Sequence, residues 1–170
     1  MRTFLCLATL WVGLSQPASS QELGRSKGQG YFFVAPGLGN IPPSNANIHI
    51  GGGGEWLLRK GFGMGLEIGA LGPLGKGPER MPFRWTDNVR GLGSANFSYH
   101  FLPSTTDQKL EPFVTAGYST FFRAGISNGY NAGAGVNIWV KNKTALRFEI
   151  RDHQSYNRDT LSFRAGMTFR

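Results

Sequence analysis

The chain has little cysteine, no long apolar run and few acidic residues, and each lack excludes a class of protein. Its one cysteine, Cys6, lies in a short N-terminal apolar stretch, so the rest of the chain has no thiol with which to build disulfides. That stretch, Phe4 to Leu14, is well short of the roughly 20 apolar residues that a membrane-spanning helix needs. Any part of the remaining chain that enters a membrane must therefore form a closed β-barrel, because lipid offers no partner for backbone N–H and C=O groups.

The N-terminal residues carry the pattern of an export signal. Arg2 precedes the apolar stretch, and the small residues Ala18 and Ser20 suit a signal peptidase. The sequence thus predicts a signal peptide at residues 1–20, cut before Gln21, then a short extension at 21–29 and one barrel domain at 30–170. A short uncleaved anchor is the alternative. Cys6 lies inside the apolar stretch rather than at its end, which argues against a lipoprotein.

The scarcity of acidic residues makes the chain basic, with 18 Lys+Arg against 10 Asp+Glu. Nucleic acid is a common partner of basic chains, but an exported protein rarely meets it, so we expect none here. Contact with lipopolysaccharide phosphates or anionic lipid is the better electrostatic interpretation. Charge that is simply dispersed and solvated is the alternative.

Glycine and apolar residues, by contrast, are abundant, and they alternate. Between Gly61 and Gly72 the large side chains Phe62, Met64, Leu66 and Ile68 share one parity, while glycines and one glutamate hold the other. A period of two predicts an extended strand, because successive side chains point to opposite sides of the backbone. One face of this strand is apolar, and the other is narrow and polar.

This alternation recurs along the chain and predicts an all-β protein. We expect a single eight-stranded antiparallel up-and-down transmembrane β-barrel, with tight turns near 59–60 and 141–143 and longer connections at 40–45, 73–88, 123–129 and 154–159. Short turns at one end and long loops at the other are typical of outer-membrane barrels, whose termini lie on the periplasmic side. Phe113 breaks the alternation of its segment, and the first segment is apolar on both parities. The eight segments are Gly30–Gly39, Ala46–Leu58, Gly61–Gly72, Val89–Phe101, Leu110–Phe122, Tyr130–Val140, Leu146–His153 and Leu161–Arg170.

Charged residues on the polar parity are expected to face the barrel interior. Glycines and paired charges suit a narrow lumen, which has room only for side chains that fill it. A narrow pore or ion gate is one interpretation, but structural pairing is favoured, because an unpaired buried charge costs several kcal/mol. Glu67 then needs an arginine across the barrel, with Arg90 or Arg147 as candidates. The expected network comprises Glu55, Glu67, Arg90, Glu111, Arg147, Glu149, Arg151 and Arg164.

Together these features resemble the small outer-membrane barrels of the OmpA/OmpX type. The resemblance rests on the signal peptide, the eight alternating segments, L-R-F-E-I-R at 146–151 and the ending L-S-F-R-A-G-M-T-F-R. It implies an outer-membrane location, insertion by the barrel-assembly machinery and a charged interior, with no cofactor. Such barrels usually end on an aromatic residue, whereas here Phe169 is followed by Arg170.

A short motif at His153-x-Ser155 is similar to the His and Ser of lipid A deacylase barrels. Both residues fall on the lumen parity, whereas that chemistry must face lipid. We therefore expect no catalytic, cofactor-binding or metal site. A lipid A-modifying barrel enzyme and a soluble periplasmic ligand-binding barrel are the alternative functions.

Two sets of residues are candidates for contacts with the membrane and its surface. Basic and aromatic residues together in the connection 73–88 suit contact with lipopolysaccharide or a surface partner; they are Lys76, Arg80, Phe83, Arg84 and Trp85. Aromatic residues near strand ends suit the interfacial girdles of a membrane barrel; they are Tyr31, Trp56, Tyr99, Tyr118, Tyr130 and Trp139.

Overall fold

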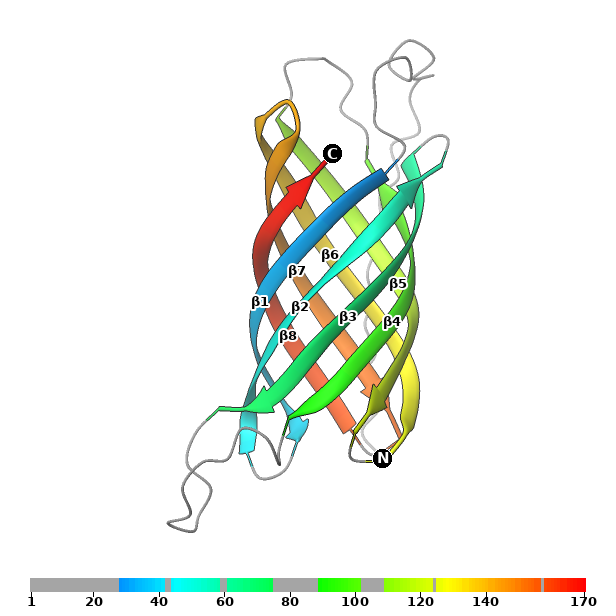
Figure 1. The fold of residues 1–170 in the computed structure, drawn as a ribbon, viewed down its shortest axis with the longest axis vertical. Helices are drawn as coiled ribbons and strands as arrows, with labels where there is room; N and C mark the ends of the chain where they lie inside the picture. Colours follow the sequence, from blue (N-terminus) through cyan, green and yellow to red (C-terminus); the bar gives the residue numbers. More distant parts are fainter. Residues whose placement is uncertain are drawn as a thin grey trace, which may run out of the picture.

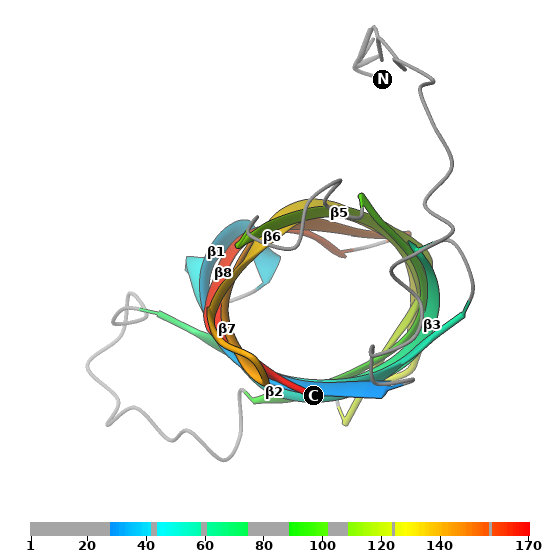
Figure 2. The ribbon, with the colours of Figure 1, turned by 90° about the horizontal axis from the view of Figure 1, so that it is seen from above.

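The protein is a closed eight-stranded barrel in the computed structural model (Figure 1). The structure describes residues 28–41, 44–58, 61–74, 89–101, 109–123, 125–156 and 158–170. Each strand pairs antiparallel with its neighbours in the chain, and β8 pairs with β1 to close the ring (Figure 2). The predicted fold is confirmed. The strands are β1 (Gly28–Ile41), β2 (Ser44–Leu57), β3 (Phe62–Pro73), β4 (Arg90–His100), β5 (Leu110–Phe122), β6 (Ser127–Lys141), β7 (Thr144–Ser155) and β8 (Arg158–Phe169).

The alternating pattern becomes an inner and an outer surface. In β3, Leu66 is 71% exposed and Ile68 is 66% exposed, whereas Glu67 between them is 5% exposed. The same alternation of buried and exposed positions runs through β4, β5 and β7. The apolar parity therefore faces outward and the polar parity faces the lumen. None of the described residues belongs to a helix long and apolar enough to cross a membrane.

The chain connections differ in part from the prediction. The barrel has a near end, where β1 begins and β8 ends, and a far end opposite (Figure 1). At the far end residues 74–89 join β3 to β4, but the other three connections are shorter than predicted and span 42–43, 123–126 and 156–157. The ladders continue there through residues typical of turns, with Ile41 opposite Ser44 and Ser155 opposite Arg158. Residues typical of turns can stay paired in a ladder, so composition alone does not end a strand.

The two irregular segments are explained by aromatic residues that point inward. Phe113 and Phe121 of β5 are buried in the lumen, and so are Tyr31 and Phe33 of β1. Apolar residues on both parities therefore belong to strands that carry aromatic rings inside as well as outside. The placement of Tyr31 in an outer girdle is wrong.

The other predicted girdle residues divide between the two faces. Trp56, Tyr118 and Tyr130 are exposed on the outside. The Tyr99 ring lies against the Phe62 ring of β3, with centroids 5.0 Å apart. Trp139 turns toward the interior, where its indole nitrogen donates to Glu111 Oε2 at 2.9 Å. The girdle is thus smaller than the sequence suggested.

Candidate functional site

The barrel interior holds most of the charged residues named from the sequence. Seven of the eight are buried in the lumen, namely Glu55, Glu67, Glu111, Arg147, Glu149, Arg151 and Arg164. Arg90, the eighth, is half-buried and begins β4 at the far end. The contacts of the seven divide them into two groups at different heights in the barrel, a near-end cluster and a central cluster.

The near-end cluster consists of Glu55, His100, Glu111 and Arg170. His100 lies between two carboxylates, with its Nε2 at 2.9 Å from Glu55 Oε1 and its Nδ1 at 2.7 Å from Glu111 Oε1. His100 is thus within ion-pair distance of both carboxylates, and its Nε2 is hydrogen-bonded to Glu55 Oε1. Ser98 and Gln29 also donate to the Glu55 carboxylate.

Arg170 closes this cluster from the end of the last strand. Its Nη2 donates to both oxygens of Glu111, at 3.1 and 2.9 Å, and its guanidinium lies over the Trp139 ring at 3.8 Å from the centroid. The backbone N–H of Arg170 also donates to the Lys143 carbonyl at 2.9 Å. The residue that departs from the usual aromatic ending therefore ties β8 to β5 and β6 across the near end.

The central cluster consists of Glu67, Arg147, Glu149, Arg151 and Arg164. Arg164 Nη1 and Arg151 Nη1 both contact Glu67 Oε2, at 2.8 and 3.2 Å. Arg151 also donates from Nε to Glu149 Oε1 at 2.6 Å, and Arg147 Nη2 lies 3.4 Å from Glu149 Oε2. Three arginines thus share two glutamates, which leaves one excess positive charge in a buried site.

The partners of Glu67 differ from the two candidates taken from the sequence. Glu67 pairs with Arg151 and Arg164 rather than with Arg90 or Arg147. The strands of a barrel tilt and stagger, so residues that meet across the lumen are not those that alternation alone would align. Arg147 instead places its guanidinium between two aromatic rings, 4.5 Å from the Tyr31 centroid and 4.0 Å from the Phe113 centroid.

Glycines on the lumen face make room for these charges. A Cβ on Gly133 would lie 2.9 Å from Glu149 Oε1, and one on Gly63 would collide with the Glu55 carboxylate and the Ser98 hydroxyl. A Cβ on Gly69 would collide with the His49 ring. The glycine-rich parity of the sequence therefore makes room for the polar side chains of the neighbouring strands.

Beyond the central cluster, toward the far end, the lumen also holds apolar side chains. Leu71, Leu92 and Phe121 form a buried cluster contributed by three neighbouring strands. Phe33 belongs to a second buried cluster, with Tyr31 and Ala35, and its ring lies edge-on to His49 at 4.8 Å and beneath the Arg164 guanidinium at 4.2 Å. On the far-end side the lumen therefore holds apolar side chains beside buried polar ones.

The histidine of the deacylase-like motif, His153, has hydrogen-bond partners that do not suit a catalytic base. His153 Nε2 lies 2.9 Å from Arg164 Nη2, and its Nδ1 lies 3.0 Å from Ser119 Oγ. Since arginine only donates, Nε2 must accept, and in the neutral ring Nδ1 carries the proton that is donated to Ser119. His153 therefore cannot act as a base toward Ser119.

Ser155, the other residue of the motif, has a different partner. Its hydroxyl bonds that of Ser127 at the far end, on the neighbouring strand. His153 bonds Ser119 and Arg164 instead, so the two residues of the motif have different partners. His153 and Ser155 are not assembled as a nucleophile and its base. Among the described residues, no group of three or more His, Cys, Asp and Glu side chains could hold a metal ion.

Several lumen residues were not among those named from the sequence. His100 and His49 lie on the polar parity of their strands, which was the available signal, but nothing local indicates their partners. Other sequence candidates cannot be placed. The predicted surface contacts in 75–88 and the predicted signal peptide lie outside the described residues.

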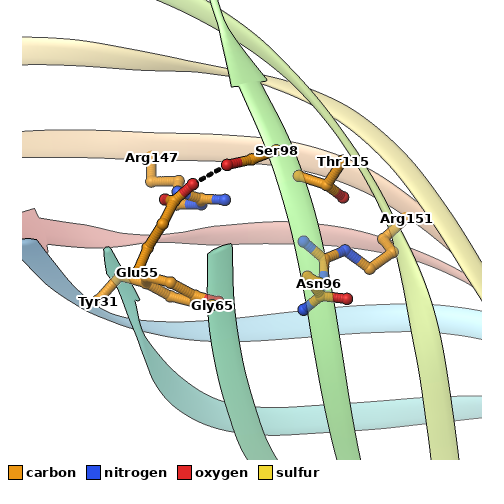
Figure 3. A pocket seen from close by; sticks show the side chains of 8 residues that line it. All are labelled: Tyr31, Glu55, Gly65, Asn96, Ser98, Thr115, Arg147 and Arg151. Atoms are coloured by element: carbon orange, nitrogen blue, oxygen red, sulfur yellow. Dashed lines mark hydrogen bonds between the residues drawn. The ribbon is translucent and has the colours of Figure 1, made fainter. Parts of the chain in front are cut away.

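The lumen leaves little free space among these groups. A cavity of about 10 Å³ lies between the two clusters (Figure 3). This is close to the smallest cavity that can hold one water molecule, on the order of 10–15 Å³. The cavity is lined by Tyr31, Glu55, Gly65, Asn96, Ser98, Thr115, Arg147 and Arg151.

Comparison with known proteins places the fold. No family model and no curated protein matches the chain. Among solved structures, Neisserial surface protein A matches with a TM-score of 0.65 at 13% identity, covering 86% of this chain and 98% of its own. The chain has the fold of the small eight-stranded outer-membrane β-barrels. The predicted resemblance to OmpA/OmpX-type barrels is confirmed at the level of fold.

Two Pseudomonas aeruginosa proteins match this outer-membrane barrel fold in the same way. The N-terminal β-barrel domain of OprF has a TM-score of 0.57 at 15% identity, covering 83% of this chain and 96% of its own. The outer membrane protein OprG has a TM-score of 0.55 at 10% identity, covering 85% and 96%. At such identities the likeness concerns the barrel and not its ligands or partners.

Proposed function

We propose that the protein is a small integral outer-membrane barrel with a structural or surface-interaction role and without an open pore. The observation that carries this proposal is the orientation of the two faces. Large apolar side chains such as Leu66, Phe97 and Phe163 are exposed on the outside, while ionised groups fill the inside. A soluble ligand-binding barrel would need the opposite arrangement, because its outer surface must be hydrated.

The closed-pore part of the proposal rests on how the lumen is filled. The near-end cluster, the central cluster and the apolar cluster of Leu71, Leu92 and Phe121 follow one another along the barrel. An ion would have to separate paired guanidinium and carboxylate groups, each of which loses several kcal/mol when left unpaired in a buried site. The charges thus hold the barrel together instead of conducting ions.

The absence of catalysis is part of the same proposal. It is supported by the roles of His153, which donates to Ser119 and accepts from Arg164, and by the separate partner of Ser155. A triad needs a base that accepts the proton of its nucleophile and a third group that orients the base. Here the group on the far side of the imidazole is a cation.

Export and surface contacts complete the proposal. Residues 1–20 would direct export and be removed, leaving the barrel domain 30–170 to be inserted by the barrel-assembly machinery. The outer wall would contact lipid, and the connection 73–88 would contact lipopolysaccharide or a surface partner. Its basic and aromatic residues suit anionic headgroups; they are Lys76, Arg80, Phe83, Arg84 and Trp85.

Fractionation combined with a heat-modifiability gel tests the proposal. The full chain expressed in a Gram-negative host should appear in the outer-membrane fraction, without the first 20 residues by mass. Unboiled protein should run as a compact species that shifts on heating. Planar-bilayer recording of the folded barrel should show no stable conductance steps. Recovery in the soluble periplasmic fraction, or regular open channels, would contradict it.

A further inference from the structure

The cavity between the two clusters is lined by polar atoms with no partner in the described chain. Both the Nδ2 and the Oδ1 of Asn96, the Oγ1 of Thr115 and the Nη1 of Arg147 are buried without a hydrogen bond. The three side chains are each more than nine-tenths buried. Buried polar groups in folded proteins nearly always find a partner, since each orphan loses its hydration. Three of them around one small cavity point to a ligand.

The size of the cavity restricts that ligand to a very small molecule. Its volume of about 10 Å³ is close to what one water needs, on the order of 10–15 Å³, and a buried water usually makes about three hydrogen bonds. The walls come from strands on different sides of the lumen, and their side chains converge on it in Figure 3.

The chemistry of the lining distinguishes water from a small ion. Arg147 and the Asn96 amide nitrogen offer donors, whereas the Asn96 amide oxygen needs a donor, and the Thr115 hydroxyl can do either. A halide would leave the amide oxygen unsatisfied and would lie close to the Glu55 carboxylate, which also lines the cavity. A cation would face the guanidinium groups of Arg147 and Arg151.

We propose that this cavity binds one ordered water that bridges Asn96, Thr115 and Arg147 at the level where the near-end cluster meets the central cluster. Glu55 belongs to the near-end cluster, and Arg147 and Arg151 belong to the central cluster, so the water lies where the two meet. From this water the hydrogen-bonded groups continue through the central cluster to His153 and Ser119, nearer the far end.

Replacing Thr115 by valine tests the proposal through the direction in which the stability of the barrel changes. Valine has nearly the same shape without the hydroxyl. If a water accepts or donates at Thr115, Thr115→Val removes one of its partners and lowers the urea midpoint of unfolding in lipid vesicles. If the hydroxyl is an orphan, removing it leaves the midpoint unchanged or raises it. Either of those two results overturns the proposal.

A matched control fixes the scale of that experiment. Thr160 is also a buried lumen threonine, but its hydroxyl bonds Asn47 directly, with Asn47 Nδ2 at 3.1 Å. Thr160→Val should lower the midpoint whether or not the cavity is hydrated. We expect Thr115→Val to shift the midpoint in the same direction, and Thr115→Ser, which keeps the hydroxyl, to recover most of the loss.

A crystal structure at a resolution that shows ordered waters gives the direct test. The wild-type chain should show a density peak within hydrogen-bond distance of Asn96, Thr115 and Arg147, and Thr115→Val should weaken it. Crystals grown in bromide should show no anomalous peak there. An anomalous peak would identify an anion site and overturn the assignment of water, as would a cavity without density.

Discussion

Replacing Glu67 by glutamine is the most informative perturbation of the interior. Glu67 Oε2 contacts Arg164 and Arg151 at 2.8 and 3.2 Å and accepts from the Tyr31 hydroxyl at 3.1 Å. Glutamine keeps the shape and one acceptor oxygen but removes the charge. The central cluster then has three arginines for one carboxylate instead of two, all of them buried in the lumen.

The size of the stability loss depends on whether each arginine still contacts a carboxylate. Arg151 still pairs with Glu149, whereas Arg164 has no second carboxylate within ion-pair distance among the described residues. Breaking a buried pair by removing one partner costs about 3–5 kcal/mol. We therefore expect Glu67→Gln to lower the free energy of unfolding by about 3–5 kcal/mol, mainly through Arg164.

The assay is urea unfolding of the barrel in lipid vesicles, followed by tryptophan fluorescence and checked by gel mobility. The double variant Glu67→Gln with Arg164→Met is the matched comparison. Because it leaves no unpaired charge on Arg164, it should recover part of the stability lost in the single variant. A loss below about 1 kcal/mol in the single variant is what a solvent-exposed ion pair would give. It would show that solvent screens the charges in the lumen and would refute this reasoning.

Further predictions concern Glu149, Arg170, Ser155 and the connection between β3 and β4. Glu149→Gln should weaken the heat resistance of the folded barrel, because Arg147 and Arg151 both contact this carboxylate; unchanged mobility after heating would contradict that. Arg170→Gln should cost about 1.5–3 kcal/mol in urea unfolding, the range for hydrogen bonds to charged groups, and a neutral result would remove its closing role. Ser155→Ala should leave the lipid A of expressing cells unchanged by mass analysis, whereas altered acylation would revive the enzyme alternative. Deleting residues 75–86 should leave the barrel folded but change surface binding, and unaltered adhesion and envelope permeability would make this connection a spacer.

The architecture was predictable because it depends on local alternation. Leu66, Glu67 and Ile68 already show which parity faces outward, and the structure keeps that assignment. The places where alternation failed, such as Phe113, are strands that carry aromatic rings inside the barrel. A lumen side chain can be apolar when a guanidinium packs on its ring, as Arg147 does here, and parity alone cannot reveal this.

The pairing inside the lumen was less predictable, for a different reason. The identity of the charged residues could be read from parity, but partners across the barrel depend on strand tilt and stagger. Glu67 therefore meets Arg164 rather than Arg90, and His100 joins two glutamates from different strands. The ends of the strands were also mispredicted, because Ser155 and Arg158 lie in a predicted loop but remain paired in the ladder at the far end.

The central claim is that the apolar parity faces lipid, and nitroxide accessibility on β3 tests it most directly. In a chain without Cys6, spin labels at Leu66→Cys and Ile68→Cys would be compared with one at Asn142→Cys in the exposed near-end turn. In lipid vesicles the β3 labels should be relaxed strongly by oxygen and weakly by a water-soluble nickel complex, with the reverse at residue 142. Stronger relaxation by nickel than by oxygen at residues 66 and 68 would place this face in water and contradict the membrane barrel.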